Sequence, residues 1–309
     1  MKTTKQKWEK LGQIISPEEK YTWMEAYAGP SFVEKLDKDT LRIYITGRDR
    51  NNISRIGYAD LDANDLKTIK HISPEPIYDV GDIGCFDESG VSYPWIVDKE
   101  NGERFMYYVG WVAGGISRFQ NFTGLAKSTD GGKSYSRVKR VPILDRTDKE
   151  PIGSGSVAVL KDDVWKIWYT SFVKWEEIEG KVFHFYHIKY AESDDGINWK
   201  RNQQVAIDFK SPRENTIGKP MIIKEADGYK MYYSYRNMDS SYRIGYAESP
   251  DGINWERMDE SLDLDVSETG WDNEMIEYAY VFDLNGKRHM IYNGNSFGKT
   301  GLGLARLEN

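Results

Sequence analysis

A motif that recurs at long, nearly constant intervals constrains the fold of this chain more than any other feature. The segment 190–201, YAESDDGINWKR, returns at 246–257 as YAESPDGINWER, and a looser copy, LAKSTDGGKSY, occupies 125–135. Degenerate copies begin at Tyr58 and Leu304. The starts 58, 125, 190, 246 and 304 are therefore 67, 65, 56 and 58 residues apart. A long internal period predicts an architecture built from repeated units, here about sixty residues each.

Each unit reads as four strands joined by turns. An alternating apolar run precedes the motif, as in 104–109 and 229–235, and Asp-Gly pairs stand where a hairpin needs positive φ. A further apolar stretch precedes each alternating run, at 30–33, 94–97, 156–159, 220–223 and 279–281. The motif supplies the third strand and the start of an outer, fourth strand. The pattern predicts an all-β protein, a five-bladed β-propeller with four-stranded antiparallel blades.

The two ends of the chain complement each other in this scheme. The last unit ends at Asn309, after its third strand. The segment 7–10, KWEK, resembles NWER at 254–257, and 11–15 continues as a strand. We therefore expect the N-terminal strand to complete the last blade and close the ring, which removes an exposed sheet edge. Residues 1–309 would then form a single propeller domain.

Charge and rare residue types exclude several classes of function. A net charge of −7 argues against a nucleic-acid partner. The one cysteine, Cys85, excludes an internal disulfide, and four histidines without an HExxH motif predict neither a metal site nor a cofactor. The basic start at 1–7 has no apolar run after it, and no stretch of 18 apolar residues occurs. We expect a soluble, cytoplasmic protein without a membrane partner.

The predicted blades place the candidate binding residues on one face. The loops between second and third strands, and the connections that enter each inner strand, open on the same face. The Ser-x-Asp-Gly turn lies on the opposite face and is predicted to be structural. The candidate substrate-binding residues of the first face are Glu25, Arg48, Glu88, Trp111, Arg118, Glu150, His187, Lys219, Tyr235, Arg236, Glu274 and Asn293.

The repeat, the Pro residues that open inner strands and the period over the whole chain resemble the arabinanase/levansucrase/invertase superfamily. The similarity is greatest to family 43 and family 32 glycoside hydrolases and to family 130 phosphorylases. It implies catalysis by two carboxyl groups, one of which protonates the leaving oxygen. Family 43 enzymes carry these groups just before the inner-strand Pro.

This chain departs from that pattern in most of its repeats. The equivalent dipeptides are Ala28-Gly29, Ser92-Tyr93, Ser154-Gly155 and Gly218-Lys219, and only Glu277, before Tyr278-Ala279, keeps a carboxylate. Glu277 is thus the predicted general acid. Asp87 or Glu214, in the polar approaches to inner strands, is the predicted base.

These observations favour a carbohydrate-active enzyme of the glycoside hydrolase or phosphorylase type. The arginines in the loops favour an anionic or phosphorylated sugar, because guanidinium forks match carboxylate and phosphate oxygens. Two alternatives stay open. One is a non-catalytic glycan-binding propeller, and the other is a transferase in surface-polysaccharide or glycoconjugate synthesis.

Overall fold

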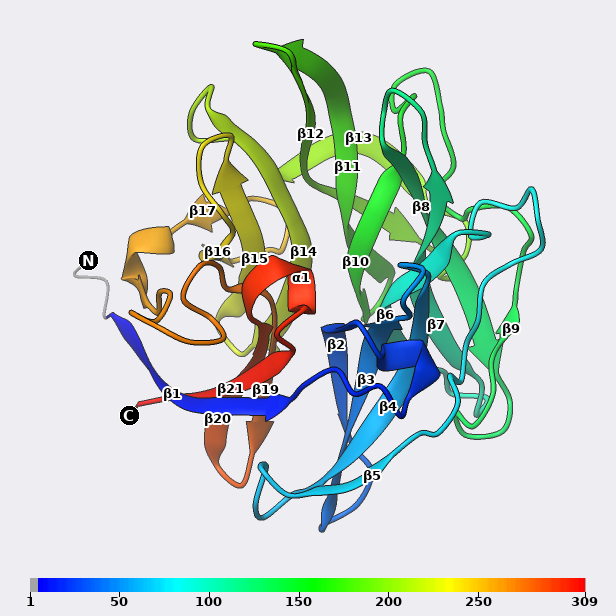
Figure 1. The fold of residues 1–309 in the computed structure, drawn as a ribbon. Coiled ribbons are helices and arrows are strands. Elements are labelled where there is room, and N and C mark those ends of the chain that lie inside the picture. The colour runs from blue at the N-terminus through cyan, green and yellow to red at the C-terminus, as the bar shows by residue number, and fades with distance from the viewer. Residues whose placement is uncertain (1–4, 309) are drawn as a thin grey trace.

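The computed structural model describes residues 5–308, and the remaining basic start at 1–4 lies outside the described part. Strands dominate the described chain, so the all-β prediction is confirmed (Figure 1). Its helical elements are the short turns η1 (Thr22–Met24), η2 (Asp259–Ser261) and α1 (Asn295–Gly298). No helix among these residues has the length and apolar character needed to cross a membrane.

Antiparallel pairing sorts the strands into groups that follow the sequence repeat. The first group contains β2 (Tyr27–Lys35), β3 (Thr40–Arg48), β4 (Ser54–Asp62) and β5 (Ile69–Ile72). The second contains β6 (Gly90–Asp98), β7 (Arg104–Ala113), β8 (Phe119–Ser128) and β9 (Ser136–Arg137). The third contains β10 (Ser154–Lys161), β11 (Trp165–Ile178), β12 (Lys181–Ser193) and β13 (Lys200–Ile207). The fourth contains β14 (Glu214–Glu225), β15 (Gly228–Asn237), β16 (Arg243–Ser249) and β17 (Glu256–Arg257).

The last group joins the two ends of the chain. It contains β19 (Glu277–Leu284), β20 (Lys287–Asn293), β21 (Leu302–Leu307) and β1 (Gln6–Ile15), and β1 runs antiparallel to β21. On its other edge β1 pairs in parallel with β18 (Leu262–Asp263). Trp8 of β1 packs edge-on against Tyr232 of β15, so the N-terminal strand also contacts the fourth group.

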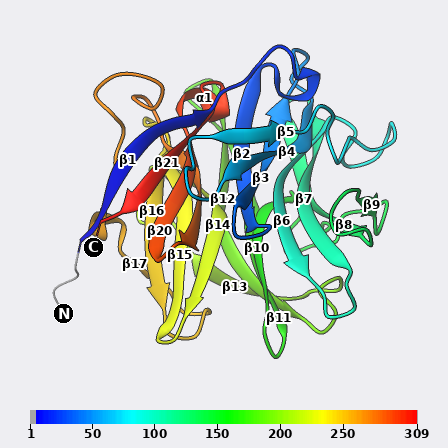
Figure 2. The same ribbon diagram turned by 90° about the horizontal axis from the view of Figure 1, so that it is seen from below.

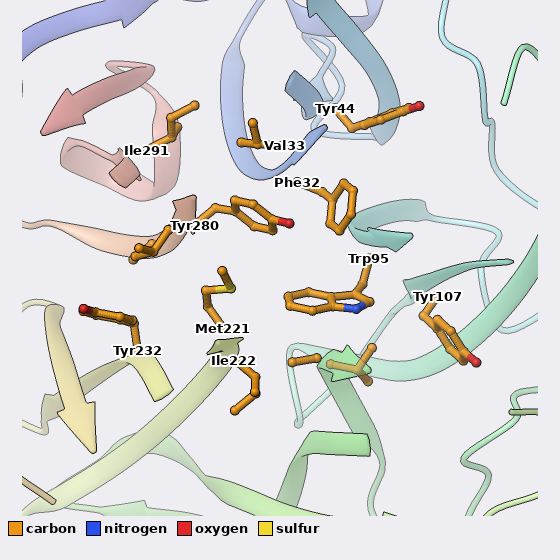
Figure 3. Close-up of a cluster of buried hydrophobic side chains, with 14 of the residues drawn as sticks. Phe32, Val33, Tyr44, Trp95, Tyr107, Met221, Ile222, Tyr232, Tyr280 and Ile291 are labelled. Carbon is orange, nitrogen blue, oxygen red and sulfur yellow. The ribbon is translucent and has the colours of Figure 1, made fainter. Parts of the chain in front are cut away.

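The first strands of the groups lie innermost. Contacts link β2 to β6, β6 to β10, β10 to β14, β14 to β19 and β19 back to β2. Figures 1 and 2 show these strands around a common centre. Their side chains meet there, as Figure 3 shows for Phe32, Trp95, Met221 and Tyr280. The ring of Phe32 lies 5.0 Å from that of Tyr280 and 5.7 Å from that of Trp95. The centre is therefore filled by apolar packing at this level.

The repeated turns join neighbouring groups. The hydroxyl of Ser193 accepts the backbone N–H of Gly196 at 3.0 Å, and the carbonyl of Gly196 accepts the Tyr107 hydroxyl of the preceding group at 2.8 Å. The next copy repeats the arrangement, because Trp168 Nε1 donates to the carbonyl of Gly252 at 2.8 Å. Trp255 also packs edge-on against Trp168. The most prominent motif in the sequence thus has a structural role in the contacts between groups.

Candidate functional site

A pocket of about 600 Å³ opens on the face that carries the loops between second and third strands. Six of the predicted binding residues line it: Arg48, Glu88, Trp111, Arg118, Lys219 and Arg236. Within the described chain, the residues of the Ser-x-Asp-Gly turns are not part of its lining. The site therefore combines side chains that are far apart in the sequence.

Irregularities in the inner strands shape the floor of this pocket. Pairing shifts register in each inner strand near the position of the expected Pro. Tyr93, Lys219 and Tyr278 stand at these bulges with φ of 54°, 53° and 57°. Such left-handed conformations are rare for side-chain-bearing residues and are concentrated at functional sites. All three residues line the pocket, so each bulge turns a large side chain toward it.

Hydroxyl groups of neighbouring strands hold these bulges in place. The backbone N–H of Tyr93 donates to Thr46 Oγ1 at 3.0 Å, and that of Lys219 donates to Ser156 Oγ at 3.0 Å. The N–H of Tyr278 donates to Ser234 Oγ at 2.7 Å. Each bond crosses from one group of strands to the next, so contacts between groups set the positions of the floor residues.

Glu277 is fully buried beside the lining residue Tyr278. Neither of its carboxylate oxygens has a hydrogen-bond partner within residues 5–308. Burial raises the pKa of Glu277 well above its ordinary value, and the Tyr278 hydroxyl and the guanidinium groups of Arg236 and Arg48 lower it by less. Burial therefore favours the protonated form of Glu277. Asn293, its cross-strand partner, is equally buried, and its amide group is also unpaired there.

Four basic side chains line the pocket without a carboxylate partner in the described part of the chain: Arg48, Arg118, Lys219 and Arg236. The neighbouring acids are used elsewhere. Glu25 pairs with Arg50 at 2.9 Å, and Glu214 pairs with Arg257 at 2.8 Å. Arg48 donates one bond to Asn52 Oδ1 at 3.1 Å, and Nη2 of Arg236 lies 3.2 Å from Nε2 of His184. The remaining guanidinium donors can bind an anionic ligand.

Burial changes the charge of two basic groups in this pocket. It lowers the pKa of Lys219 to about 7, and the ammonium group has no hydrogen-bond partner among the described residues. It also lowers the pKa of His184 to about 3, assisted by the positive charges of Arg236 and Arg118. His184 is thus neutral, and its Nε2 lies 3.2 Å from Nη2 of Arg236. The fixed positive charge of the pocket therefore comes from its arginines.

Two of the predicted catalytic residues, Asp87 and Glu214, and the predicted binding residue Glu150 lie in ion pairs outside the pocket lining. Asp87 accepts the Tyr108 hydroxyl at 2.9 Å and pairs with Arg137 at 2.8 Å. Glu214 pairs with Arg257 at 2.8 Å. Glu150 pairs with Arg201 at 3.1 Å and with Lys189 at 3.2 Å. These acids enter inner strands and pair with bases on the third or outer strand of their own group. They stabilise each group, so none of them is free for chemistry in the pocket.

The remaining predicted binding residues lie away from the pocket lining. His187 is buried and bonds to Asp208 at 3.0 Å, while Tyr235 lies over Arg257. Glu274 is exposed, and its backbone carbonyl accepts a bond from Arg243 at 3.2 Å. The described residues contain no group of three His, Cys, Asp or Glu side chains able to hold a metal ion.

Aromatic rings make up much of the lining that sequence reasoning missed: Tyr93, Phe119, Phe172, Tyr186, Tyr242 and Tyr278. Tyr93 and Tyr278 were visible in the sequence, since they follow Ser92 and Glu277 at the inner-strand entry. Phe119 and Tyr186 lie on long third strands whose periodicity gives no sign that they face a pocket.

Comparison of the folds places the protein among propeller-type glycosidase structures. It superimposes on a glycoside hydrolase with a TM-score of 0.75 at 17% identity, over 99% of this chain and 93% of the other. A glycosyl hydrolase from Bacteroides ovatus gives 0.74 at 16%, over 98% and 94%. A third structure also gives a TM-score of 0.74 at 16% identity, over 99% of this chain and 95% of the other. It comes from work on the GH130 family of mannoside phosphorylases, which contains glycoside hydrolases that target β-1,2 mannosidic linkages in Candida mannan. The resemblance to this superfamily is thus confirmed for the fold.

Sequence comparison identifies the family itself. Two Mycobacterium tuberculosis proteins, the uncharacterized MT1551 of strain CDC 1551 and the uncharacterized Rv1502 of strain H37Rv, are each 35% identical over 303 residues. The match covers 98% of this chain and 99% of each relative. The chain belongs to the family of these two proteins. No model of a described protein family matches it.

Proposed function

We propose that the protein is a carbohydrate-active enzyme of the glycoside hydrolase or phosphorylase type, acting on an anionic or phosphorylated sugar in the pocket. We further propose that residues 1–309 form one five-bladed propeller domain, with the five groups of strands as blades and β1 closing the ring. The closed cycle of contacts among inner strands and the pairing of β1 with β21 support this architecture.

The observation that carries the functional proposal is the combination of Glu277 with unpaired arginines. A buried, protonated carboxyl group can give its proton to a leaving oxygen as the bond to the anomeric carbon breaks. Arg48 and Arg236 are the charged groups that act on Glu277. They would hold an anionic group of the substrate, or inorganic phosphate as the attacking group, near the sugar.

A non-catalytic glycan-binding protein is the second candidate. It is favoured by the scarcity of carboxylates, because Glu88 is the one acidic residue that lines the pocket in the described chain and Glu277 lies behind the lining. Glycoside hydrolysis ordinarily uses two carboxyl groups about 5–9.5 Å apart. Phosphorolysis and binding do not need the second group on the protein.

Anion binding provides the first test of the proposal, because it needs no known substrate. Calorimetric titration with phosphate and with glucuronate should show binding to the wild type. Arg236→Ala should weaken that binding about tenfold or more, since a charge-assisted bond contributes ~1.5–3 kcal/mol. Arg140→Ala, which removes an exposed arginine paired with Asp82, is the control and should bind as the wild type does. Equal, weak binding by all three proteins would exclude an anionic ligand.

A further inference from the structure

A wall of aromatic rings stands at the pocket where the hairpin of β7 and β8 meets the hairpin of β11 and β12. We define this hairpin wall as Trp111, Phe119, Phe172 and His184, which line the pocket, together with Trp175, which lies beside them. The ring of Phe119 lies 5.2 Å from those of Trp111 and Trp175 and 5.5 Å from that of His184. The two strands are the longest of their group, and Figure 1 shows the hairpin extending past its neighbours. Trp175, near the outer part of the wall, is partly exposed.

The arginines connect this wall to the floor of the pocket. Arg236 acts on Glu277 at the floor, and its Nη2 lies 3.2 Å from Nε2 of His184 in the wall. Arg118 directly precedes Phe119 and is close enough to His184 to influence its charge. The order from the floor outward is therefore a proton donor, unpaired guanidinium groups, and then flat rings.

We propose that the pocket takes a nucleoside diphosphate sugar, with the sugar at the Glu277 floor, the diphosphate on the arginines and the base on the hairpin wall. This inference rests on the proposed function and names its substrate class. Each part of such a ligand meets the chemistry that recognises it. A guanidinium group can donate two parallel hydrogen bonds to the oxygens of one phosphate. Every nucleobase has a flat face that can stack on an aromatic side chain.

The size and composition of the pocket agree with this ligand. At about 600 Å³ it falls in the range that buries drug-sized molecules, which are larger than one sugar ring. Glu88, the one acid of the described lining, already accepts the backbone N–H of Gly84 at 2.6 Å. An isoprenoid diphosphate would also join an apolar group to a diphosphate. Trp175, which is partly exposed and nearly parallel to Phe172 at 15°, gives the nucleoside a ring to stack on that a flexible chain does not need.

Matched ligands separate the two parts of the recognition. Calorimetry would compare pyrophosphate, uridine, geranyl diphosphate and the panel ADP, GDP, CDP and UDP. We expect at least one nucleoside diphosphate to bind about tenfold or more tightly than pyrophosphate, because stacking on one aromatic side chain is worth that factor. Trp175→Ala should remove this advantage and leave the affinity for pyrophosphate unchanged.

The controls make each outcome decisive. Trp175→Phe keeps a ring and should retain most of the advantage, and Trp255→Ala, on the opposite face, should retain all of it. Thermal melting reports whether Trp175→Ala folds, and Trp175→Leu replaces it if it does not. Nucleoside diphosphates that bind no better than pyrophosphate would overturn the inference while leaving anion binding intact. So would geranyl diphosphate that matches the best nucleotide. A wild-type protein that binds neither phosphate nor glucuronate would instead count against the proposed function.

Discussion

Glu277 and Lys219 are buried residues without an ion-pair partner in the described chain, and burial shifts their pKa values in opposite directions. It raises the pKa of the Glu277 carboxyl group and lowers that of the Lys219 ammonium group, so it favours the neutral form of each. Both residues enter inner strands of the pocket floor. Burial therefore disfavours charge at the floor, and the arginines above it supply the field that attracts an anion.

Glu277→Gln tests the proposed acid directly. The amide keeps the shape of the side chain but has no acidic proton, so turnover of a substrate should fall by ~10²-fold or more. Ligand affinity and melting temperature should change little. Turnover within a factor of a few of the wild type would contradict a catalytic role. A protein that fails to fold would indicate that Glu277 acts as a structural support.

Lys219 predicts a pH dependence of stability. Its pKa is lowered to about 7 in the folded protein, whereas the unfolded chain keeps a value near 10.5. The unfolded state therefore binds the extra proton between these values, and the free energy of unfolding should rise with pH through that window. Lys219→Met should be more stable than the wild type, by an upper bound of roughly 5 kcal/mol, at pH 7 and below. The difference should disappear toward pH 10 in denaturant titrations. The exposed Lys139→Met should show no such trend.

The sequence predicted the place of Glu277 at the start of an inner strand because its position relative to the repeat is fixed, and its catalytic role stays a prediction. It could not locate the partners of the other acids. Asp87 and Glu214 stand in equally polar approaches to inner strands, but their bases, Arg137 and Arg257, lie on the outer strands of the same groups. Such pairs depend on sheet geometry, and a sequence pattern does not distinguish a paired acid from a free one.

At the scale of the element, the repeated turns contribute to stability, whereas the inner strands form the pocket floor. Asp195 accepts the backbone N–H groups of Ile197 and Asn198 at 2.8 Å, and Asp251 repeats both bonds one unit later. These bonds lower the pKa of Asp195 to about 2, although partial burial opposes them. The stabilisation is therefore complete above about pH 4 and is lost as the pH falls toward 2.

Asp195→Ala should reduce the free energy of unfolding by about 1–3 kcal/mol, because a few backbone bonds lose their acceptor. Trp255→Ala should also lower stability, since its ring packs on Trp168. Chemical denaturation measures both effects, and calorimetry should give unchanged ligand affinity. A variant as stable as the wild type but unable to bind would show that the turns belong to the functional face.

The inner strands show where prediction from an element reaches its limit. Their positions follow from apolar stretches near the observed cores of β2, β6, β10, β14 and β19. The bulges do not follow from those stretches. A shift of register depends on hydroxyl groups from the neighbouring group, such as Thr46 for Tyr93, and this contact spans 47 residues. A local sequence pattern therefore does not predict this contact.

At the scale of the whole molecule, the repeat predicted the strand order and the contact of the two ends. Deleting residues 1–15 removes β1, together with the buried side chains of Trp8, Ile14 and Ile15. We expect a loss of stability on the order of 5 kcal/mol, from apolar burial alone at about 1.5–3 kcal/mol for each side chain. It also breaks the ion pair of Lys10 with Asp272 at 2.7 Å. A truncated protein with an unchanged melting temperature would contradict the proposed role of β1 in closing the ring.

The packing of Phe32, Trp95, Met221 and Tyr280 at the centre bears on the side from which a ligand can reach the pocket floor. The rings of Phe32, Trp95 and Tyr280 lie within 5.9 Å of one another, so apolar side chains stand between the pocket floor and the opposite face. A substrate of the proposed enzyme would therefore approach Glu277 from the mouth of the pocket.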